Sequence, residues 1–334
     1  MDPEKTRAVR EALLAWFASN ARDLPWRRTR DPWRVLVSEV MLQQIQVKRA
    51  IPFYERFLTR FPTVKALADA PLSDAIRVWG DLGRYRRVVN LHRTARLVVD
   101  EHGGRVPDDP EVLVTLPGVG PYTAGAVACF AFERDVAFAD TNMLRVLHRV
   151  FIGPDVPAPA ARPKEVLDLA AGLVPAGGSW VWNQAVMEFG ALRCTARKPG
   201  CEGCPLAEHC RARTGIRGIL AQTSRPARKP SAPRYEETNR YLRGRVLAQL
   251  RGEEPSSSLA LPELARRLRG ETAGVEPAGL RAAVESLERD GLVRVSLPDG
   301  KAGGLAAEAV AEERASYAAG SEEGDLSGIR VALP

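Results

Sequence analysis

Four of the five cysteines lie close together, in the stretch CTARKPGCEGCPLAEHC at residues 194–210. Their spacing is Cys194-x6-Cys201-x2-Cys204-x5-Cys210. The N-terminus is charged and lacks the apolar segment of a signal peptide, so we expect a cytoplasmic protein with reduced thiols, which argues against disulfides. Only Cys201 and Cys204 form a close pair of the zinc-finger type, and four thiolates in one compact loop suit either zinc or an iron–sulfur cluster. The spacing alone leaves the metal open.

Two carboxylic acids occur in settings that favour opposite ionisation. Glu39 is the only charged residue between Arg34 and Lys48 in the helical stretch WRVLVSEVMLQQIQVKR. A mostly apolar helix face raises the pKa of a carboxyl group, which suits a general acid, although a surface glutamate at the rim of a core helix is the alternative. Asp140 precedes the helical MLRVLHRV and is expected to be an N-cap whose N–H donors keep it ionised. Cleavage of a glycosidic bond requires one neutral and one charged carboxyl group of this kind.

A glycine-containing turn comes before an apolar helix that starts near Pro121. In LPGVG, residues 116–120, Gly118 and Gly120 permit a tight turn and let a ligand approach the backbone. Free N–H groups at a helix start suit a phosphate. An ordinary helix–helix turn is the alternative.

The elements that must position these groups are mainly helices. Residues 6–192 carry apolar residues at every third or fourth position, are interrupted by Pro and Gly, and contain no run of alternating strand type. The chain has 334 residues, is 45% hydrophobic and 27% charged, and has a net charge of +7. These values fit a soluble protein of several domains with a polyanionic partner such as nucleic acid. No apolar run is long enough to span a bilayer.

The composition divides the chain into four segments. Residues 1–214 form a helical core that ends with the cysteine loop, and residues 215–233 form a linker, because SRPARKPSAP is proline-rich, basic and without apolar content. Within 234–300, three short helices, the strand-like LVRVSL at 292–297 and a PDG turn predict a small winged-helix-like module. Residues 301–334 are rich in Ala, Glu, Gly and Ser, and we expect them to be loosely packed.

The cysteine spacing resembles the [4Fe-4S] loop of the endonuclease III and MutY-type branch of the helix-hairpin-helix DNA glycosylases. LPGVG is similar to the hairpin of that family, in which the turn holds a DNA phosphate. LPWR, SEVMLQQ, IPFYERFLTRFPTV, LPGVGPYTAGA and NQAVMEFGAL resemble MutY-type adenine DNA glycosylases in the same order, so that the match covers residues 7–212. The resemblance implies a six-helix barrel domain, an iron–sulfur helical domain, and a monomer that acts on duplex DNA with a mispaired or damaged base. It also implies a [4Fe-4S] cluster ligated by Cys194, Cys201, Cys204 and Cys210.

The resemblance assigns catalytic roles as well. Glu39 would protonate the adenine ring, and Asp140 would stabilise the oxocarbenium-like sugar. Tyr122 and Asn142 match residues beside them. Relatives of the endonuclease III type carry a lysine nucleophile where this chain has Tyr122, which predicts base removal without efficient strand cleavage.

The remaining expected contacts are to the flipped base and the DNA. Arg27 and Glu188 match residues that contact the flipped base. Gln43, Gln44 and Leu82 are candidates for wedging between bases, with helix packing as the alternative. The basic and aromatic residues near Tyr85 are further candidates for contact with DNA, with a solvated charged face as the alternative. The hairpin completes the set of expected DNA contacts. The predicted DNA-contacting residues are Gln43, Gln44, Leu82, Arg84, Tyr85, Gly118, Val119 and Gly120.

Three departures from the family concern the base opposite the target. Ile45 stands where the family usually has a threonine that helps contact 8-oxoguanine, and the family's GLGYY is DLGRY here, with Arg84 in place of a tyrosine. Residues 235–334 do not resemble the usual Nudix-like domain that checks for 8-oxoguanine. We therefore expect an adenine-directed glycosylase, acting on adenine or a related purine, with altered or relaxed choice of the opposite base.

Two other functions fit part of the pattern. A mismatch thymine or uracil glycosylase of the same superfamily would share the tyrosine and the aspartate but generally lacks the acid at Glu39. A non-catalytic regulator that binds DNA and senses redox state would need only the iron–sulfur loop and the winged helix.

Overall fold

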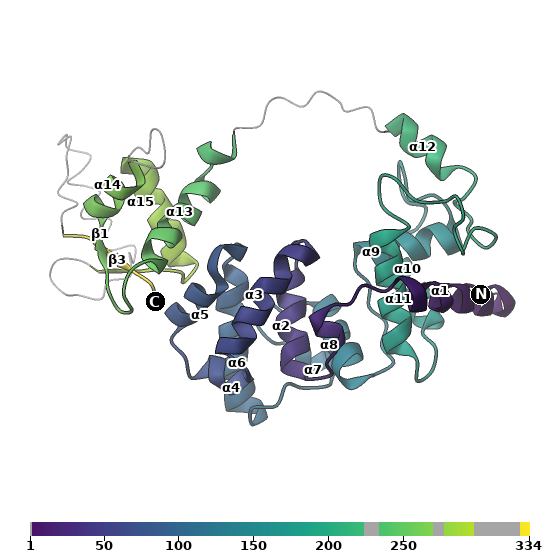
Figure 1. Ribbon diagram of the computed structural model, residues 1–334, viewed down its shortest axis with the longest axis horizontal. Coiled ribbons are helices and arrows are strands. Elements are labelled where there is room, and N and C mark those ends of the chain that lie inside the picture. Colours follow the sequence, from purple (N-terminus) through teal and green to yellow (C-terminus); the bar gives the residue numbers. More distant parts are fainter. Residues whose placement is uncertain (1, 224–233, 270–276, 297–327) are drawn as a thin grey trace. The chain divides into compact units, whose positions relative to one another are not determined.

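The computed structural model in Figure 1 describes residues 2–223, 234–269, 277–296 and 328–334. These residues form two compact units, each built from two separated stretches of chain. Unit 1 comprises Met1–Gln43 and Val106–Pro230, and unit 2 comprises Gln44–Arg105 and Ser231–Pro334. The single helical core expected for residues 1–214 is therefore shared between both units. None of the helices that the structure describes combines the length and apolar character needed to cross a membrane.

Several helices of unit 1 start at Asp-Pro pairs, which can be recognised in the sequence. Asp2, Asp31 and Asp109 are N-caps, and each accepts a hydrogen bond from a backbone N–H of its helix while the following proline occupies the first helical position. The elements of unit 1 are α1 (Pro3–Asn20), η1 (Pro25–Arg27), α2 (Pro32–Leu42), α7 (Pro110–Leu113), α8 (Pro121–Phe132), α9 (Thr141–Leu147), η3 (His148–Ile152), α10 (Pro163–Leu173), α11 (Ser179–Leu192) and α12 (Ile216–Thr223).

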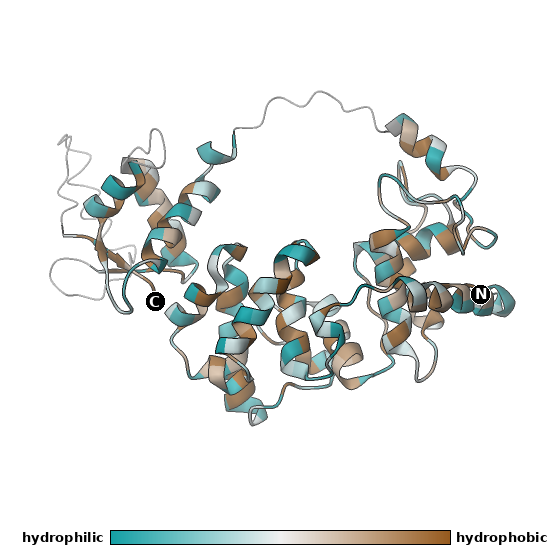
Figure 2. Cartoon of the chain, viewed as in Figure 1, coloured by the Kyte–Doolittle hydropathy of each residue, from teal (hydrophilic) through white to brown (hydrophobic). Residues whose placement is uncertain are grey.

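Helix α8 is the centre of unit 1. Its sequence PYTAGAVACFAF is apolar on all sides, and residues Thr123 to Ala131 are buried. Helix α2 packs against α8, α11 packs against both α1 and α9, and most helices carry apolar and polar residues together, as expected of helices around a core (Figure 2). A Cβ atom at Gly125 would lie only 2.6 Å from Cβ of Phe138. The segment that leads to Asp140 therefore packs directly on the backbone of α8.

Unit 2 begins with helices around an aromatic core. Phe57 packs against Phe61 and Trp79, with ring centroids 5.0 and 5.8 Å apart. The elements of this half are α3 (Val47–Arg60), α4 (Val64–Ala68), α5 (Leu72–Trp79), η2 (Gly80–Leu82) and α6 (Arg86–His102). The other half, which we call the C-terminal segment (234–334), contains η4 (Tyr235–Glu237), α13 (Asn239–Arg251), β1 (Leu259–Ala260), α14 (Leu261–Arg269), α15 (Pro277–Arg289), β2 (Arg294–Ser296) and β3 (Arg330–Ala332).

The C-terminal segment forms a small antiparallel sheet beside its helices. The strand order is β1-β3-β2, and Val331 pairs with both Leu259 and Val295. The expectation of loose packing for 301–334 is wrong for Arg330–Ala332, because this stretch is the central strand and Val331 is fully buried. A strand of three residues is too short to give a detectable alternation. The PDG turn and residues 301–327 lie outside the described residues.

The segment expected to be a linker starts later than its composition indicated. Residues 216–223 form helix α12, and Ala212, Ile216 and Leu220 make a small apolar cluster against which Cys201 and Cys210 pack. The residues from 224 to 233 lie outside the part of the chain that the structure describes.

The contact between α8 and Phe138 gives a stability prediction. Gly125→Ala forces Cβ of Phe138 away and should lower the free energy of unfolding by about 1–3 kcal/mol. Gly218→Ala in α12 is the matched control, because its Cβ would meet nothing within 4 Å. A helix-interior glycine costs roughly 0.5–1 kcal/mol relative to alanine, so the control should be slightly stabilised. Urea titrations of both variants test this, and an unchanged midpoint for Gly125→Ala contradicts it.

Candidate active site

Glu39 lies on α2 with its side chain turned into unit 1. It is 6% exposed, and Val35 and Leu36 on its helix face are buried. Burial raises the pKa of Glu39 from 4.5 to about 7; a hydrogen bond from Tyr122 opposes this rise, and the charge of Asp140 adds to it. The apolar helix face predicted a raised pKa, and the structure agrees. Near neutral pH a large fraction of this group carries a proton that it can donate.

Tyr122 lies in the first turn of α8 and interacts electrostatically with both carboxyl groups. Burial raises its pKa well above the ordinary value, and the nearby charges of Glu39 and Asp140 raise it further. The phenol therefore stays protonated and acts as a hydrogen-bond donor to Glu39. Its ring packs edge-on against Phe138 at 5.6 Å. The predicted residues Glu39, Tyr122 and Asp140 are thus brought together.

Asp140 is the N-cap of α9, as its position before MLRVLHRV predicted. One carboxylate oxygen, Oδ1, accepts the backbone N–H of Met143 at 2.7 Å, and Oδ2 accepts Nδ2 of Asn142 at 2.9 Å. Both donors fix the orientation of the carboxylate. Asn142 therefore acts on Asp140 directly.

A chain of hydrogen bonds joins Asp140 to the cysteine loop. Asn142 accepts a bond at Oδ1 from Nη2 of Arg145 at 2.8 Å. The same guanidinium donates to the carbonyl of Gly190 at 2.7 Å and, through Nε, to the carbonyl of Cys194 at 2.8 Å. The orientation of Asp140 thus depends on where the cysteine loop begins.

The predicted hairpin forms a turn at the start of α8. Gly118 has φ of 78°, a conformation that favours glycine, and Val119 is buried beneath it. Gly120 is exposed and is the N-cap of α8, without a side-chain cap. The first N–H groups of this 12-residue helix are therefore available to an anion such as a phosphate.

Glu188 and Arg27 form a buried ion pair with a third residue, Arg22. Glu188 is fully buried, and its Oε2 lies 2.6 Å from Nη2 of Arg22 and 3.0 Å from Nη2 of Arg27. Burial alone would raise the pKa of Glu188, but hydrogen bonds from Arg22 and Arg27 lower it to about 2. Arg27 also donates to Oε1 of Gln184 at 2.7 Å. Sequence reasoning missed Arg22, because nothing in its local pattern points to a partner so far along the chain.

The candidates for wedging between bases differ in exposure. Gln43 ends α2 and donates to the hydroxyl of Thr123 at 3.4 Å. In unit 2, Gln44 and Arg84 are exposed and have positive φ angles of 58° and 51°. Leu82 is 2% exposed and packs inside unit 2, so it would have to leave this interior in order to act as a wedge.

The four clustered cysteines form no disulfide among the described residues and interact electrostatically with one another. Burial raises the pKa of Cys210, and the charges of the other three thiols raise it further. The described side chains, as they stand, contain no group of three Cys, His, Asp or Glu residues that could hold a metal ion. The donor set of four thiols, half-buried and mutually close, still suits an iron–sulfur cluster.

The buried Arg149 holds one side of this loop. It donates to the carbonyls of Thr195 and Ala196 at 2.8 and 3.2 Å, and its Nη1 lies 3.7 Å from Sγ of Cys194. An ion pair with Asp155 at 2.6 Å fixes the guanidinium.

Comparison with known families defines the class of protein. Residues 37–171 match the HhH-GPD superfamily of base excision DNA repair proteins, and residues 194–210 match the iron–sulfur binding domain of endonuclease III. The structure is similar to that of a thermostable thymine-DNA glycosylase, with a TM-score of 0.59 and 32% sequence identity over 63% of this chain and 97% of that chain. The chain is thus a mainly helical base excision DNA repair protein of the HhH-GPD superfamily, and the predicted [4Fe-4S] cofactor is confirmed.

Sequence relatives identify the branch. The chain is 43% identical over 244 residues to the adenine DNA glycosylase of Mycobacterium tuberculosis strain H37Rv, covering 72% of this chain and 78% of the relative. It is 41% identical over 283 residues to the adenine DNA glycosylase of Mycolicibacterium smegmatis, covering 84% of this chain and 91% of the relative. The chain belongs to the adenine DNA glycosylase family, which confirms the resemblance found in its motifs.

The pKa of Glu39 predicts the pH dependence of base release. A general acid must be protonated, so the single-turnover rate constant should be constant at low pH and should fall about tenfold per unit as the pH rises above about 7. Tyr122→Phe removes a hydrogen bond that stabilises the charged form, and should move this decline to higher pH. A decline that moves to lower pH in the variant contradicts the assignment.

The ion pair of Glu188 predicts a stability effect distinct from catalysis. Glu188→Gln leaves two arginines without a buried counter-charge and should cost about 3 kcal/mol in unfolding free energy. Because the pKa of Glu188 is lowered to about 2, this contribution is present above pH 4.5 and is lost as the pH falls toward 2. Glu165→Gln, which removes an exposed ion pair with Arg162, is the control and should leave the free energy of unfolding nearly unchanged. Denaturant unfolding at pH 7 measures both, and loss of base release with unchanged stability would instead favour the predicted base contact.

Proposed function

We propose that the protein is a monofunctional DNA glycosylase that flips adenine, or a closely related purine, out of mispaired duplex DNA and cleaves its N-glycosidic bond, with altered or relaxed choice of the opposite base. One observation carries the proposal. Glu39, whose pKa is raised to about 7, interacts electrostatically with Asp140, and Tyr122 donates a hydrogen bond to Glu39 and also interacts electrostatically with Asp140. Members of the family are named adenine DNA glycosylases, which supports adenine as the target.

The two carboxyl groups divide the reaction between the base and the sugar. Adenine is a poor leaving group as an anion, so Glu39 donates its proton to a ring nitrogen and the base departs as a neutral molecule. The electron pair of the broken C–N bond leaves with the base. Asp140 stabilises the positive charge that develops on the sugar. Water then adds to the sugar carbon, and its proton passes to a base such as the Glu39 carboxylate, which restores the acid.

Tyr122 explains why the reaction should stop at base removal. Strand cleavage by bifunctional relatives requires an amine that forms a covalent bond to the sugar. A neutral phenol hydrogen-bonded to Glu39 supplies no such nucleophile. The product is then an abasic site in an intact strand.

Binding to duplex DNA is supported by charge and by the hairpin. The net charge is +7, and the uncapped start of α8 after Gly118–Gly120 suits a backbone phosphate. Gln43, Gln44 and Leu82 are the candidates to fill the space that the flipped nucleotide leaves, and of these Gln44 is exposed. We expect a monomer that works on chromosomal DNA in the cytoplasm.

The cysteine loop is the proposed site of the [4Fe-4S] cluster. Cys194, Cys201, Cys204 and Cys210 would hold it. When bound, the cluster supplies a cross-link between four thiolates that fixes the loop. Arg145 then has a fixed carbonyl partner at Cys194 and, through Asn142, holds Asp140 in orientation.

The C-terminal segment has the element order of a winged helix, with three helices and a three-stranded antiparallel sheet. We propose that it is a winged-helix-like module, which forms one compact unit with residues 44–105. On α15, the exposed Ala278, Gly279 and Ala282 offer no hydrogen-bonding side chain, and Arg281 is paired with Glu285 at 3.1 Å. Such a surface is poorly suited to reading bases, which favours a docking role within the protein.

The proposed change in opposite-base choice is supported by the residues that this chain carries at the positions where it departs from the family. Ile45 is apolar and half-buried, so its side chain provides no hydrogen bond to 8-oxoguanine. Arg84 is an exposed cation where the family carries an aromatic ring. A guanidinium makes hydrogen bonds with several bases, whereas a ring stacks on them.

A panel of duplexes tests the proposed function. Adenine or hypoxanthine is placed opposite guanine, cytosine, thymine or 8-oxoguanine, and base release is followed by alkaline cleavage at the abasic site. The wild type should release adenine opposite guanine at a rate within about tenfold of that opposite 8-oxoguanine. Glu39→Gln should bind the same duplexes without releasing base. A strong preference for 8-oxoguanine would reject relaxed choice, and no release from any duplex would reject the enzyme.

A further inference from the structure

The Gly80–Tyr85 loop of unit 2 is held rigidly along its backbone. The indole Nε1 of Trp79 donates to the carbonyl of Gly83 at 2.9 Å, and Nη2 of Arg87 donates to the same carbonyl at 3.2 Å. The guanidinium of Arg87 also lies 5.3 Å from the ring of Trp79. Two side chains that contact each other thus fix one carbonyl of the loop.

The far side of the loop is fixed by the start of α3. Nη2 of Arg49 donates to the carbonyl of Asp81 at 2.6 Å, and Leu82 is buried beneath the loop. Arg84 is exposed at the turn with φ of 51°. A left-handed conformation at a non-glycine residue is unfavourable and persists where the surrounding structure imposes it. The direction of the Arg84 side chain therefore depends on the contacts that fix the residues around it.

One of these contacts comes from the C-terminal segment. The guanidinium of Arg251, at the end of α13, lies over the ring of Tyr85 at 5.8 Å. Its Nη1 is 3.5 Å from the position that a Cβ atom would take at Gly80. Its Nε is buried and has no hydrogen-bond partner among the described residues. Arg251 thus reaches both ends of the loop and is held there by an aromatic face.

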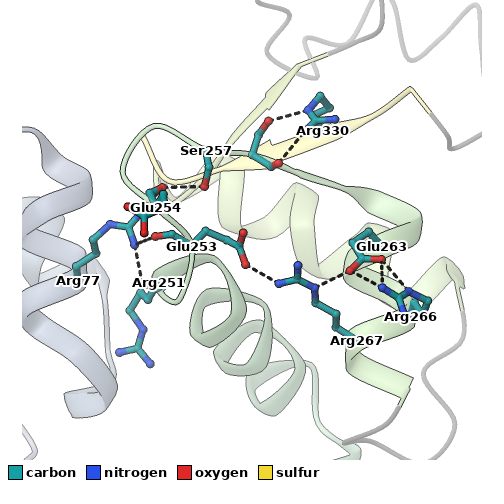
Figure 3. Close-up of polar contacts among 10 residues, drawn as sticks. Arg77, Arg251, Glu253, Glu254, Ser257, Glu263, Arg266, Arg267 and Arg330 are labelled. Carbon is teal, nitrogen blue, oxygen red and sulfur yellow. Dashed lines mark hydrogen bonds and ion pairs between the residues drawn. The ribbon is translucent and has the colours of Figure 1, made fainter.

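Arg77 anchors Arg251 from the other side. It donates through Nη1 to the carbonyls of Arg251 and Glu253, both at 2.6 Å, and through Nη2 to the carbonyl of Glu254 at 3.3 Å (Figure 3). These carbonyls are at the C-terminal end of α13, where backbone acceptors lack helical partners and cations are favoured. Arg267 continues the network by binding Glu253 at 2.5 Å.

We infer that Arg251 is a positioning residue for the Gly80–Tyr85 loop, so that the C-terminal segment helps determine which base opposite the target is accepted. This inference rests on the proposed function, in which Arg84 is one of the residues that alter the choice of the opposite base. Arg251 contacts neither the target base nor the reacting atoms. It acts through Tyr85, the residue that follows Arg84 and is the N-cap of α6.

The test removes the cation but keeps the length of the side chain. Arg251→Met and the control Arg266→Met are compared in the full-length protein; Arg266 lies in the same segment, is 77% exposed on its side chain, and pairs only locally with Glu263. Single-turnover release of adenine is measured opposite guanine, cytosine and 8-oxoguanine. Arg251→Met should change the ratios between these rate constants by about threefold to tenfold. Arg266→Met should leave the ratios unchanged, and Arg251→Lys should restore part of the wild-type pattern.

The pH profile and a second variant keep the test decisive. The fall in rate above about pH 7, which reports Glu39, should be the same in Arg251→Met and the wild type. An equal loss of rate opposite every base, or no change in the ratios, overturns the inference. If Arg251→Met does not fold, as judged by thermal unfolding, Tyr85→Leu removes the aromatic partner instead and should shift the same ratios. If the wild type strongly prefers 8-oxoguanine, the proposal of relaxed opposite-base choice is rejected. The inference about Arg251 is still tested, because it depends on rate ratios compared between the variants and the wild type.

Discussion

The structure depends on placing two nearby carboxyl groups in different surroundings. Glu39 is buried on an apolar helix face, and burial raises its pKa to about 7, to which the charge of Asp140 contributes. Asp140 accepts hydrogen bonds from two N–H donors, one from the helix that it caps and one from Asn142. The difference between them is thus made by their surroundings, since neither has a positively charged partner in hydrogen-bond contact among the described residues. This explains why the apolar α8 is central: it packs against α2, which carries the acid, and it supplies the phenol of Tyr122 that hydrogen-bonds to Glu39.

The sequence predicts the groups whose settings are local. Helical periodicity around Glu39 and the N-cap position of Asp140 each depend on residues within one turn, and both predictions agree with the structure. Arg22 could not be found in this way, because its partner Glu188 is 166 positions away and only the fold brings them together. The central strand Arg330–Ala332 could not be predicted for a related reason. Three residues are too few to show an alternation of apolar and polar side chains, and the partners of the strand lie in distant parts of the chain.

Arginines that bind backbone carbonyls connect segments of this protein that are far apart in the sequence. Arg145 and Arg149 hold the cysteine loop in unit 1, and Arg77 holds the end of α13 in unit 2. A planar guanidinium with five donors can satisfy several carbonyls at once, which a lysine cannot do in the same geometry. In unit 1 this chemistry links the cysteine loop to Asp140. The iron–sulfur loop can therefore affect base release through orientation alone, without any electron transfer.

The residues proposed for catalysis and those proposed for choice of the opposite base lie in different units of the chain. Glu39, Tyr122 and Asp140 all belong to unit 1. The departures at Ile45 and Arg84, and the unfamiliar C-terminal segment, all belong to unit 2. A substitution in unit 2 leaves the pKa of Glu39 and the donors of Asp140 intact, because none of the contacts that set them comes from that unit. Under the proposed function, a change in the accepted opposite base would therefore leave the chemistry of base removal the same.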